Sequence, residues 1–142
     1  GPRLRGYAVS SYQAGPGDEL RVNLTWQGEP GASSQSRLHS FIHIRKSQPG
    51  GPNNPLTGNE IWAQDEHYAP GGILTSDYLS GQLYRDEFRV RLPEEMPPGE
   101  YFLEVGWFDP ETGEQLDPLA DAVHSPLGIL WRSILLPPVT VE

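Results

Sequence analysis

The sequence contains no cysteine in its 142 residues. This absence excludes disulfide bonds, thiolate nucleophiles, cysteine-ligated zinc and iron–sulfur clusters. No apolar run approaches the ~20 residues that a membrane-spanning helix needs, and no stretch carries apolar residues at helical spacing. A signal-peptide pattern is also missing. We therefore expect a segment with little helix that does not itself insert into a membrane.

Basic residues are scarce, with 10 Lys and Arg against 19 Asp and Glu and a formal net charge of −9. A surface of this charge repels phosphate backbones and anionic lipid headgroups, so we expect no nucleic acid partner. Glycine and proline, by contrast, are abundant at 16 and 15 residues. Their abundance is typical of many short strands joined by tight turns.

The dominant pattern is an alternation of apolar and polar residues, which marks strands with one buried face. The apolar positions of one such segment end on Trp26 and those of another on Trp107, so we expect both tryptophans in the core. The expected strands are residues 4–12, 18–27, 38–46, 60–67, 84–92 and 101–109, with one or two more within 127–141. The pattern predicts an all-β fold, an antiparallel two-sheet β-sandwich of about 7–9 strands.

Residues 98–101, with the sequence PGEY, open one of these strands with Tyr101. In immunoglobulin-like sandwiches a tyrosine at such a corner bonds backbone near the turn. Tyr101 therefore predicts the immunoglobulin-like variety of sandwich.

No linker divides the chain, so we expect residues 1–142 to form a single domain. Residues 1–2 are compatible with a protease-cleavage scar or with a native loop. The proline pair at 137–138 either begins an exit segment over residues 137–142 or kinks the last strand.

A series of short motifs spread over residues 4–136 resembles a known family. The motifs are Gly6-Tyr7, Pro16-Gly17-Asp18, Leu24-Thr25-Trp26, Phe41-Ile42-His43-Ile44, Ala63-Gln64-Asp65, Pro70-Gly71-Gly72, Thr75-Ser76, Leu92-Pro93, residues 97–101, residues 105–109 and Thr112-Gly113. In this order the sequence resembles the extracytoplasmic β-sandwich domain at the C-terminus of bacterial multi-pass membrane proteins. Those proteins are similar to polyprenyl-phosphate-sugar-dependent glycosyltransferases of the protein mannosyltransferase type. The resemblance implies an accessory domain with no catalytic residues, whose partners are the other domains of a parent membrane protein.

His43 lies on an expected strand between two isoleucines. A proton shuttle or metal ligand is one reading, but we interpret His43 as a half-buried structural residue bonded to Gln64 or Asp65. His39 shares its face four residues away, which separates the rings by roughly 13 Å and excludes a common metal ion. Glycosidase chemistry needs two carboxyls about 5–9.5 Å apart across a cleft, and a single sandwich leaves little chain to build one. We predict no catalytic residues and no enzyme activity.

Three acidic residues, Asp109, Glu111 and Asp117, gather near one predicted turn. Sandwich loops bind Ca²⁺ through carboxylate and carbonyl oxygens, so these residues are candidate ligands. A solvated acidic turn is the alternative interpretation. We predict no other cofactor.

The irregular region between two strands is rich in aromatic residues. Sugar rings present apolar faces that stack on exposed tryptophan and tyrosine. The candidates for such glycan contacts are Trp62, Tyr68, Tyr78 and Tyr84. Packing of the loops onto the edge of the sandwich is the alternative for each of them.

Three classes of function fit the sequence. The first is an accessory sandwich that docks on a membrane-bound sugar-transfer enzyme or holds its acceptor. The second is a free-standing carbohydrate-binding module for cell-surface glycan. The third is a structural sandwich that assembles through an apolar edge or donated strand within residues 127–136. The oligomeric state stays open at this point.

Overall fold

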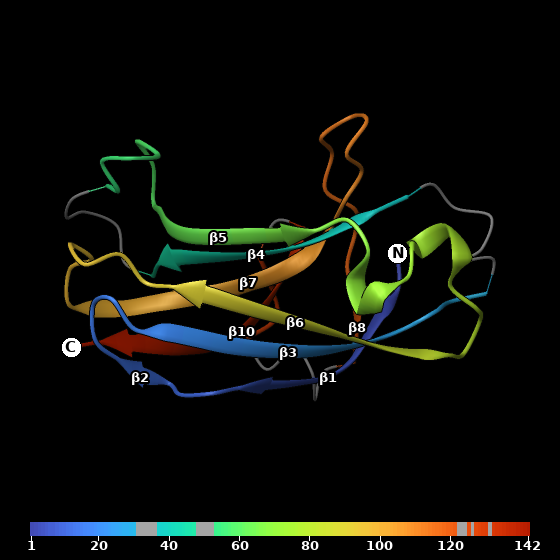
Figure 1. The fold of residues 1–142 in the computed structure, drawn as a ribbon, viewed down its shortest axis with the longest axis horizontal. Helices are drawn as coiled ribbons and strands as arrows, with labels where there is room; N and C mark the ends of the chain where they lie inside the picture. The colour runs from blue at the N-terminus through green and yellow to red at the C-terminus, as the bar shows by residue number, and fades with distance from the viewer. Residues whose placement is uncertain (31–36, 48–52, 122–124, 126, 131) are drawn as a thin grey trace.

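Two sheets pack face to face in the computed structural model, which describes residues 1–30, 37–47, 53–121, 125, 127–130 and 132–142 (Figure 1). The strand order of one sheet is β6 (Leu83–Arg91), β3 (Glu19–Gln27), β1 (Arg3–Val9), β8 (Leu119–Ala120). The order of the other is β2 (Gln13–Ala14), β10 (Ser133–Val141), β7 (Gly99–Phe108), β4 (His39–Lys46), β5 (Ile61–His67), with β9 (Ile129–Leu130) paired to β10. Two short 3-10 turns, η2 (Pro70–Gly72) and η3 (Thr75–Asp77), lie between β5 and β6. The predicted all-β sandwich is confirmed.

The core forms where the inward-facing residues of the two sheets meet. β3 and β6 pair antiparallel with Val22 opposite Phe88, and both side chains are fully buried. Trp26 and Trp107 come from opposite sheets and touch, with ring centroids 4.7 Å apart. Burying a large apolar side chain contributes roughly 1.5–3 kcal/mol to folding. Both tryptophans therefore hold the two sheets together, as the alternation predicts.

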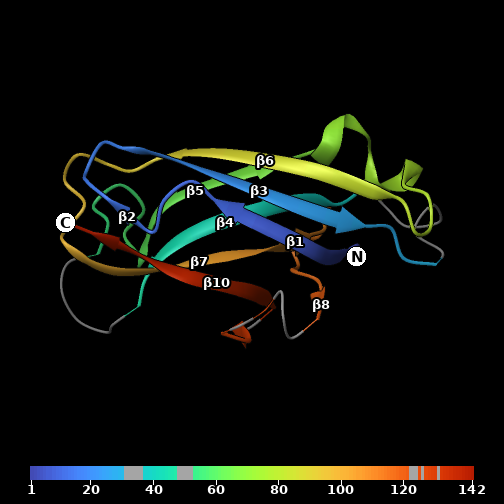
Figure 2. The ribbon, with the colours of Figure 1, turned by 90° about the horizontal axis from the view of Figure 1, so that it is seen from below.

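The first expected strand, residues 4–12, is shorter in the structure, where β1 ends at Val9 and a separate strand, β2, begins at Gln13. β1 belongs to one sheet, whereas β2 crosses to the other and runs parallel to β10 (Figure 2). At the crossing, the backbone N–H of Gln13 donates to Oγ of Ser11 at 3.1 Å. This local bond turns the chain between the two sheets, which the alternation of residues does not reveal.

The tyrosine corner forms at the start of β7. Tyr101 Oη donates to the carbonyl oxygen of Pro97 at 2.7 Å. Burial raises the pKa of the Tyr101 hydroxyl, so this group remains a donor at neutral pH. The bond ties β7 to the turn that precedes it.

The C-terminal segment distinguishes between the two alternatives for the proline pair, in favour of an irregularity within the last strand. β10 continues through Pro137 and Pro138 to Val141, so no exit segment begins at residue 137. The prolines lie at a register irregularity between Leu136 and Val139, where a missing N–H breaks no ladder bond. β10 pairs with β7 on one side, and on its other side it pairs with β9 at Ser133 and Ile134 and with β2 at Thr140 and Val141.

Among the described residues, no helix is both long enough and apolar enough to cross a bilayer.

Candidate functional site

A row of rings lies on the outer face of the second sheet, where β4 and β7 pair. The register places His39 opposite Phe108, and Phe41 opposite Gly106. Because strand side chains alternate between faces, His39, Phe41 and His43 all point away from the core. Ring centroids are 5.2 Å apart for His39 and Phe108, 6.3 Å for Phe108 and Phe41, and 4.7 Å for Phe41 and His43. The rings form a continuous floor.

The Phe41 ring fits at this position because Gly106, opposite it on β7, has no side chain. A Cβ on Gly106 would lie 3.0 Å from two carbons of that ring and 3.3 Å from the carbonyl oxygen of Arg132. The ring therefore lies across the Gly106 backbone and is 2% exposed, although it faces outward. Phe41 supports the floor from below, and the partly exposed Phe108 and His43 present the accessible ring surface.

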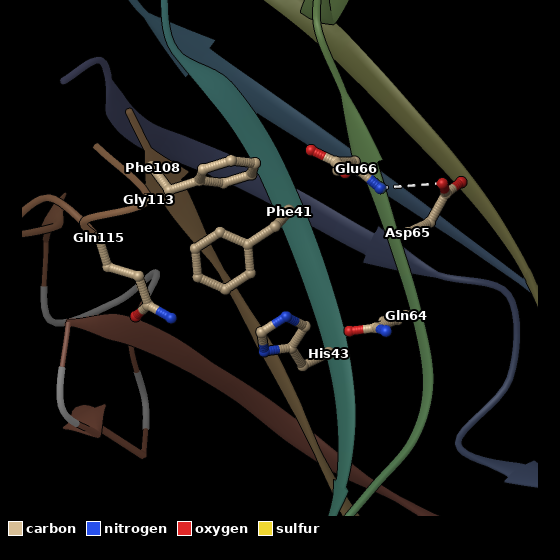
Figure 3. Close-up of a pocket in the computed structure, with 8 residues that line it drawn as sticks. All are labelled: Phe41, His43, Gln64, Asp65, Glu66, Phe108, Gly113 and Gln115. Atoms are coloured by element: carbon tan, nitrogen blue, oxygen red, sulfur yellow. Dashed lines mark hydrogen bonds between the residues drawn. The ribbon is translucent and has the colours of Figure 1, made fainter. Parts of the chain in front are cut away.

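Polar side chains from two elements border this floor and make it a groove of about 410 Å³. Gln64 and Glu66 come from β5, and Gln115 comes from the turn that follows β7. Figure 3 shows the amides of Gln64 and Gln115 on opposite sides of the rings. Gln115 forms an isolated antiparallel β-bridge with Phe108, and its backbone carbonyl accepts a hydrogen bond from the Arg132 guanidinium at 2.8 Å. These backbone contacts hold Gln115 in place. The groove is thus an apolar floor between hydrogen-bonding walls.

His43 is a neutral member of the groove. Burial, and then the charge of Arg45, lower its pKa to about 4, so the imidazole is uncharged at pH 7. Glu104 lies 4.0 Å from Nδ1, but the Glu104 carboxylate accepts from Arg45 Nε at 2.5 Å. The described part of the chain gives Nδ1 no hydrogen-bond partner. The predicted half-buried position is confirmed, but the predicted bond to Gln64 or Asp65 is not formed at this atom.

The register explains why Asp65 does not serve His43. Gln64 lies opposite His43, whereas Asp65 lies opposite Ile42, on the alternate face of β5. In Figure 3 the Asp65 carboxylate points away from the rings and accepts the backbone N–H of Glu66 at 2.8 Å. Asp65 lines the groove at its border only.

A second polar cluster lies between the two sheets, around the carboxylate of Asp86 on β6. Asp86 is 1% exposed. Its Oδ2 accepts from Ser40 Oγ at 2.6 Å and from Trp26 Nε1 at 3.2 Å, and its Oδ1 contacts Nδ1 of His67 at 2.5 Å. The bond to Asp86 and the charges of Asp86 and Asp65 raise the pKa of His67 against the effect of burial. The cluster joins four strands, and its buried position indicates a structural role.

The four aromatic residues predicted as glycan contacts are separated by the structure. Trp62, Tyr78 and Tyr84 are 4%, 0% and 8% exposed, so the expectation of exposed stacking surfaces is wrong for these three. Tyr78 stacks on Tyr84 with centroids 3.7 Å apart, and its hydroxyl donates to the carbonyl of Pro70 at 2.5 Å. The 3-10 turns fold this region onto the end of the sandwich. These three aromatic residues therefore pack in the interior, which is the alternative to glycan contact. Tyr68 differs, because it is 70% exposed.

The three acidic residues predicted as calcium ligands do not come together. Asp109 Oδ1 accepts the backbone N–H of Glu111 at 2.9 Å, as in an ordinary turn. Asp117 instead faces Arg132, with 3.4 Å between carboxylate oxygen and Nε. In the described part of the chain no three His, Cys, Asp or Glu residues are grouped to hold a metal ion.

The groove residues that sequence reasoning missed are Phe41, Gln64, Phe108 and Gln115. The sequence contained one indication of the groove: Phe41 and Phe108 are aromatic residues at outward positions of strands whose apolar and polar residues alternate. Asp86 carried the opposite signal, a carboxylate at an inward position beside Phe88. The turn that brings Gln115 to the rings has no such signature.

Compared with known proteins, the chain matches no family model and no curated protein.

Proposed function

We propose that the chain is a non-catalytic binding module and that the groove over β4, β5 and β7 takes a saccharide. The observation that carries this proposal is the row of rings between two walls of amide and carboxylate groups. Ligand sites are concave and largely preformed, with an apolar lining and a few polar groups that fix orientation. The groove has these properties.

The chemistry of the lining suits a sugar. A pyranose presents an apolar face, which would rest on the accessible ring surface of Phe108 and His43. Its hydroxyls would bond the amides of Gln64 and Gln115, which both donate and accept. His43 adds the face of a neutral imidazole, and Glu66 adds a carboxylate acceptor. Every lining group thus has a counterpart on a sugar.

The carboxylates of the groove support binding rather than hydrolysis. Asp65 and Glu66 are adjacent on β5, and only Glu66 points toward the rings, because the Asp65 carboxylate turns away from them. A glycosidase needs two carboxyls that flank one bond. Glu66 is also paired with His39 Nδ1 at 2.9 Å. We therefore propose that a bound glycan is held and not cleaved.

The motif resemblance supplies the proposed context. It supports an extracytoplasmic accessory domain of a membrane protein that transfers sugars, where the groove would hold an acceptor or a nearby glycan. The tyrosine corner, and the division of β1, β3 and β6 from β4, β7 and β10, support the immunoglobulin-like variety of sandwich. Other domains of the parent protein would then be its partners.

A glycan array tests the proposal. We expect the purified chain to bind glycans on the array. Gln64→Ala and Gln115→Ala should each weaken this binding, because each variant removes one of the side-chain amides that border the groove. Both positions are on the surface, so folding should be unaffected and unfolding temperatures should match the parent. Tyr12→Ala is the matched control, since Tyr12 is exposed near the opposite edge of the same sheet. A blank array, or hits that both variants retain, would sink the proposal.

A further inference from the structure

A second hollow lies at the end of the sandwich, just beyond the groove. Its volume is about 590 Å³. Its lining consists of Arg37, His39, Tyr68, Leu74, Pro110 and Glu111. Leu74 and Pro110 make it partly apolar, and Tyr68 contributes an aromatic ring that is 70% exposed. It is therefore another surface with the chemistry of the groove.

The same two segments of the chain border both hollows, through different residues. The turn after β7 lines the groove with Gly113 and Gln115 and the second hollow with Pro110 and Glu111. Figure 1 shows this turn in orange, rising beside the arrowhead end of β5. On the other side, Glu66 borders the groove and Tyr68, two residues further along the chain, borders the second hollow. Tyr68 directly follows His67, the last residue of β5.

One hydrogen-bonded pair of side chains lies between the hollows. His39 lines the second hollow, and its Nδ1 lies 2.9 Å from the carboxylate of Glu66, which lines the groove. The groove floor itself runs from His39 to His43, which is about 13 Å of strand. A ligand that follows the floor and passes the His39–Glu66 pair would reach Tyr68. Such a path is longer than a single sugar ring.

The charges of both hollows favour an uncharged ligand. Asp65, Glu66 and Glu111 contribute carboxylates, whereas Arg37 contributes the one guanidinium in the described lining. The chain as a whole carries a formal net charge of −9. Uronic acids and sugar phosphates would be repelled by this surface.

We infer that the two hollows are subsites of one extended site for a neutral oligosaccharide, with Tyr68 as the stacking platform of the far subsite. This inference rests on the proposed function of the groove. Tyr68 is thereby distinguished from the groove residues, because it should contact only ligands long enough to pass the His39–Glu66 pair.

Calorimetric titration with graded oligomers tests this inference. The probes are linear α-mannose and β-1,4-N-acetylglucosamine oligomers of one to five sugars, with galacturonic acid oligomers as the anionic comparison. We expect affinity to rise with length up to the tetramer, and the anionic series to bind far more weakly. Tyr68→Ala should weaken the tetramer about tenfold and leave the monomer and dimer unchanged, because a lost stacking contact corresponds to roughly one factor of ten. Tyr12→Ala should change neither.

The outcomes separate the two proposals. Binding that Gln115→Ala weakens but Tyr68→Ala does not, or affinity that stops rising at the monomer, would overturn the extended site and leave the groove intact. Equal binding of the anionic series would overturn the neutral ligand class. Absence of binding by every oligomer would overturn the extended site together with the proposed function.

Discussion

Asp86→Asn is the substitution whose effect follows most directly from the structure. Ser40 and Trp26 both donate to Oδ2, so an asparagine can keep these two bonds by placing its oxygen there. Its amide nitrogen then faces Nδ1 of His67 in place of Oδ1. The variant therefore removes one charge-assisted hydrogen bond and little volume. Such bonds contribute about 1.5–3 kcal/mol, which is the expected loss in free energy of unfolding where His67 is protonated.

The loss should depend on pH in a defined direction. Asp86 raises the folded-state pKa of His67 above its unfolded value of about 6.5. The stabilisation is therefore complete below that unfolded pKa and disappears as pH rises through the folded pKa. The difference between parent and Asp86→Asn should be larger at pH 5.5 than at pH 9. Parent and variant are compared at each pH, so other titrating groups affect both alike.

Urea unfolding followed by tryptophan fluorescence measures this difference, because Trp26 and Trp107 lie in the core. Glu87→Gln is the matched control, since the neighbouring residue on β6 faces solvent and loses the same charge. Asp86→Ala should cost more, roughly 3–5 kcal/mol, because the buried Ser40 and Trp26 and the half-buried His67 then lose their acceptor. A difference between parent and Asp86→Asn that is constant with pH, or zero at pH 5.5, would refute the reasoning about the His67–Asp86 pair.

Three further predictions concern the groove and the corner. NMR titration should give His43 a pKa near 4. Because the unfolded chain protonates this histidine near pH 6.5, the contribution of His43 to the unfolding free energy should fall by about 3 kcal/mol between pH 6.5 and pH 4. His43→Gln should abolish this contribution. Gly106→Ala should lower the unfolding free energy by about 1–3 kcal/mol in chemical denaturation, because its Cβ would press on the Phe41 ring; an unchanged midpoint would contradict the tight contact. Tyr101→Phe should cost about 1 kcal/mol in the same assay through loss of the bond to Pro97, and a neutral result would remove the corner as a stabilising feature.

The sandwich could be predicted because alternation reports burial directly. Residues 84–92 show this, since every second position of β6 is buried, including Asp86 among apolar neighbours. Strand ends were less visible: the Ser11 turn that sends β2 to the other sheet is a local hydrogen bond without an apolar signature. The proline pair was ambiguous, because proline either ends a strand or occupies an irregularity within it.

The candidate site was harder to predict than the fold, because it depends on which strands become neighbours. His43 meets Gln64 through the β4–β5 register, and Phe41 fits only because Gly106 lies opposite on β7. These pairings join residues far apart in the sequence. Aromatic content alone pointed instead to the region of Trp62 and Tyr78, where the rings are used for packing.

We propose that the outer face of the sheet formed by β4, β5 and β7 binds saccharide. The most direct measurement is an NMR titration of the labelled chain with mannotetraose and with chitotetraose, following side-chain amides and aromatic rings. We expect shifts for at least one of them that concentrate at Gln64, Gln115 and Phe108 and extend to Tyr68. Shifts confined to the opposite sheet, or none with either sugar at millimolar concentration, would contradict it.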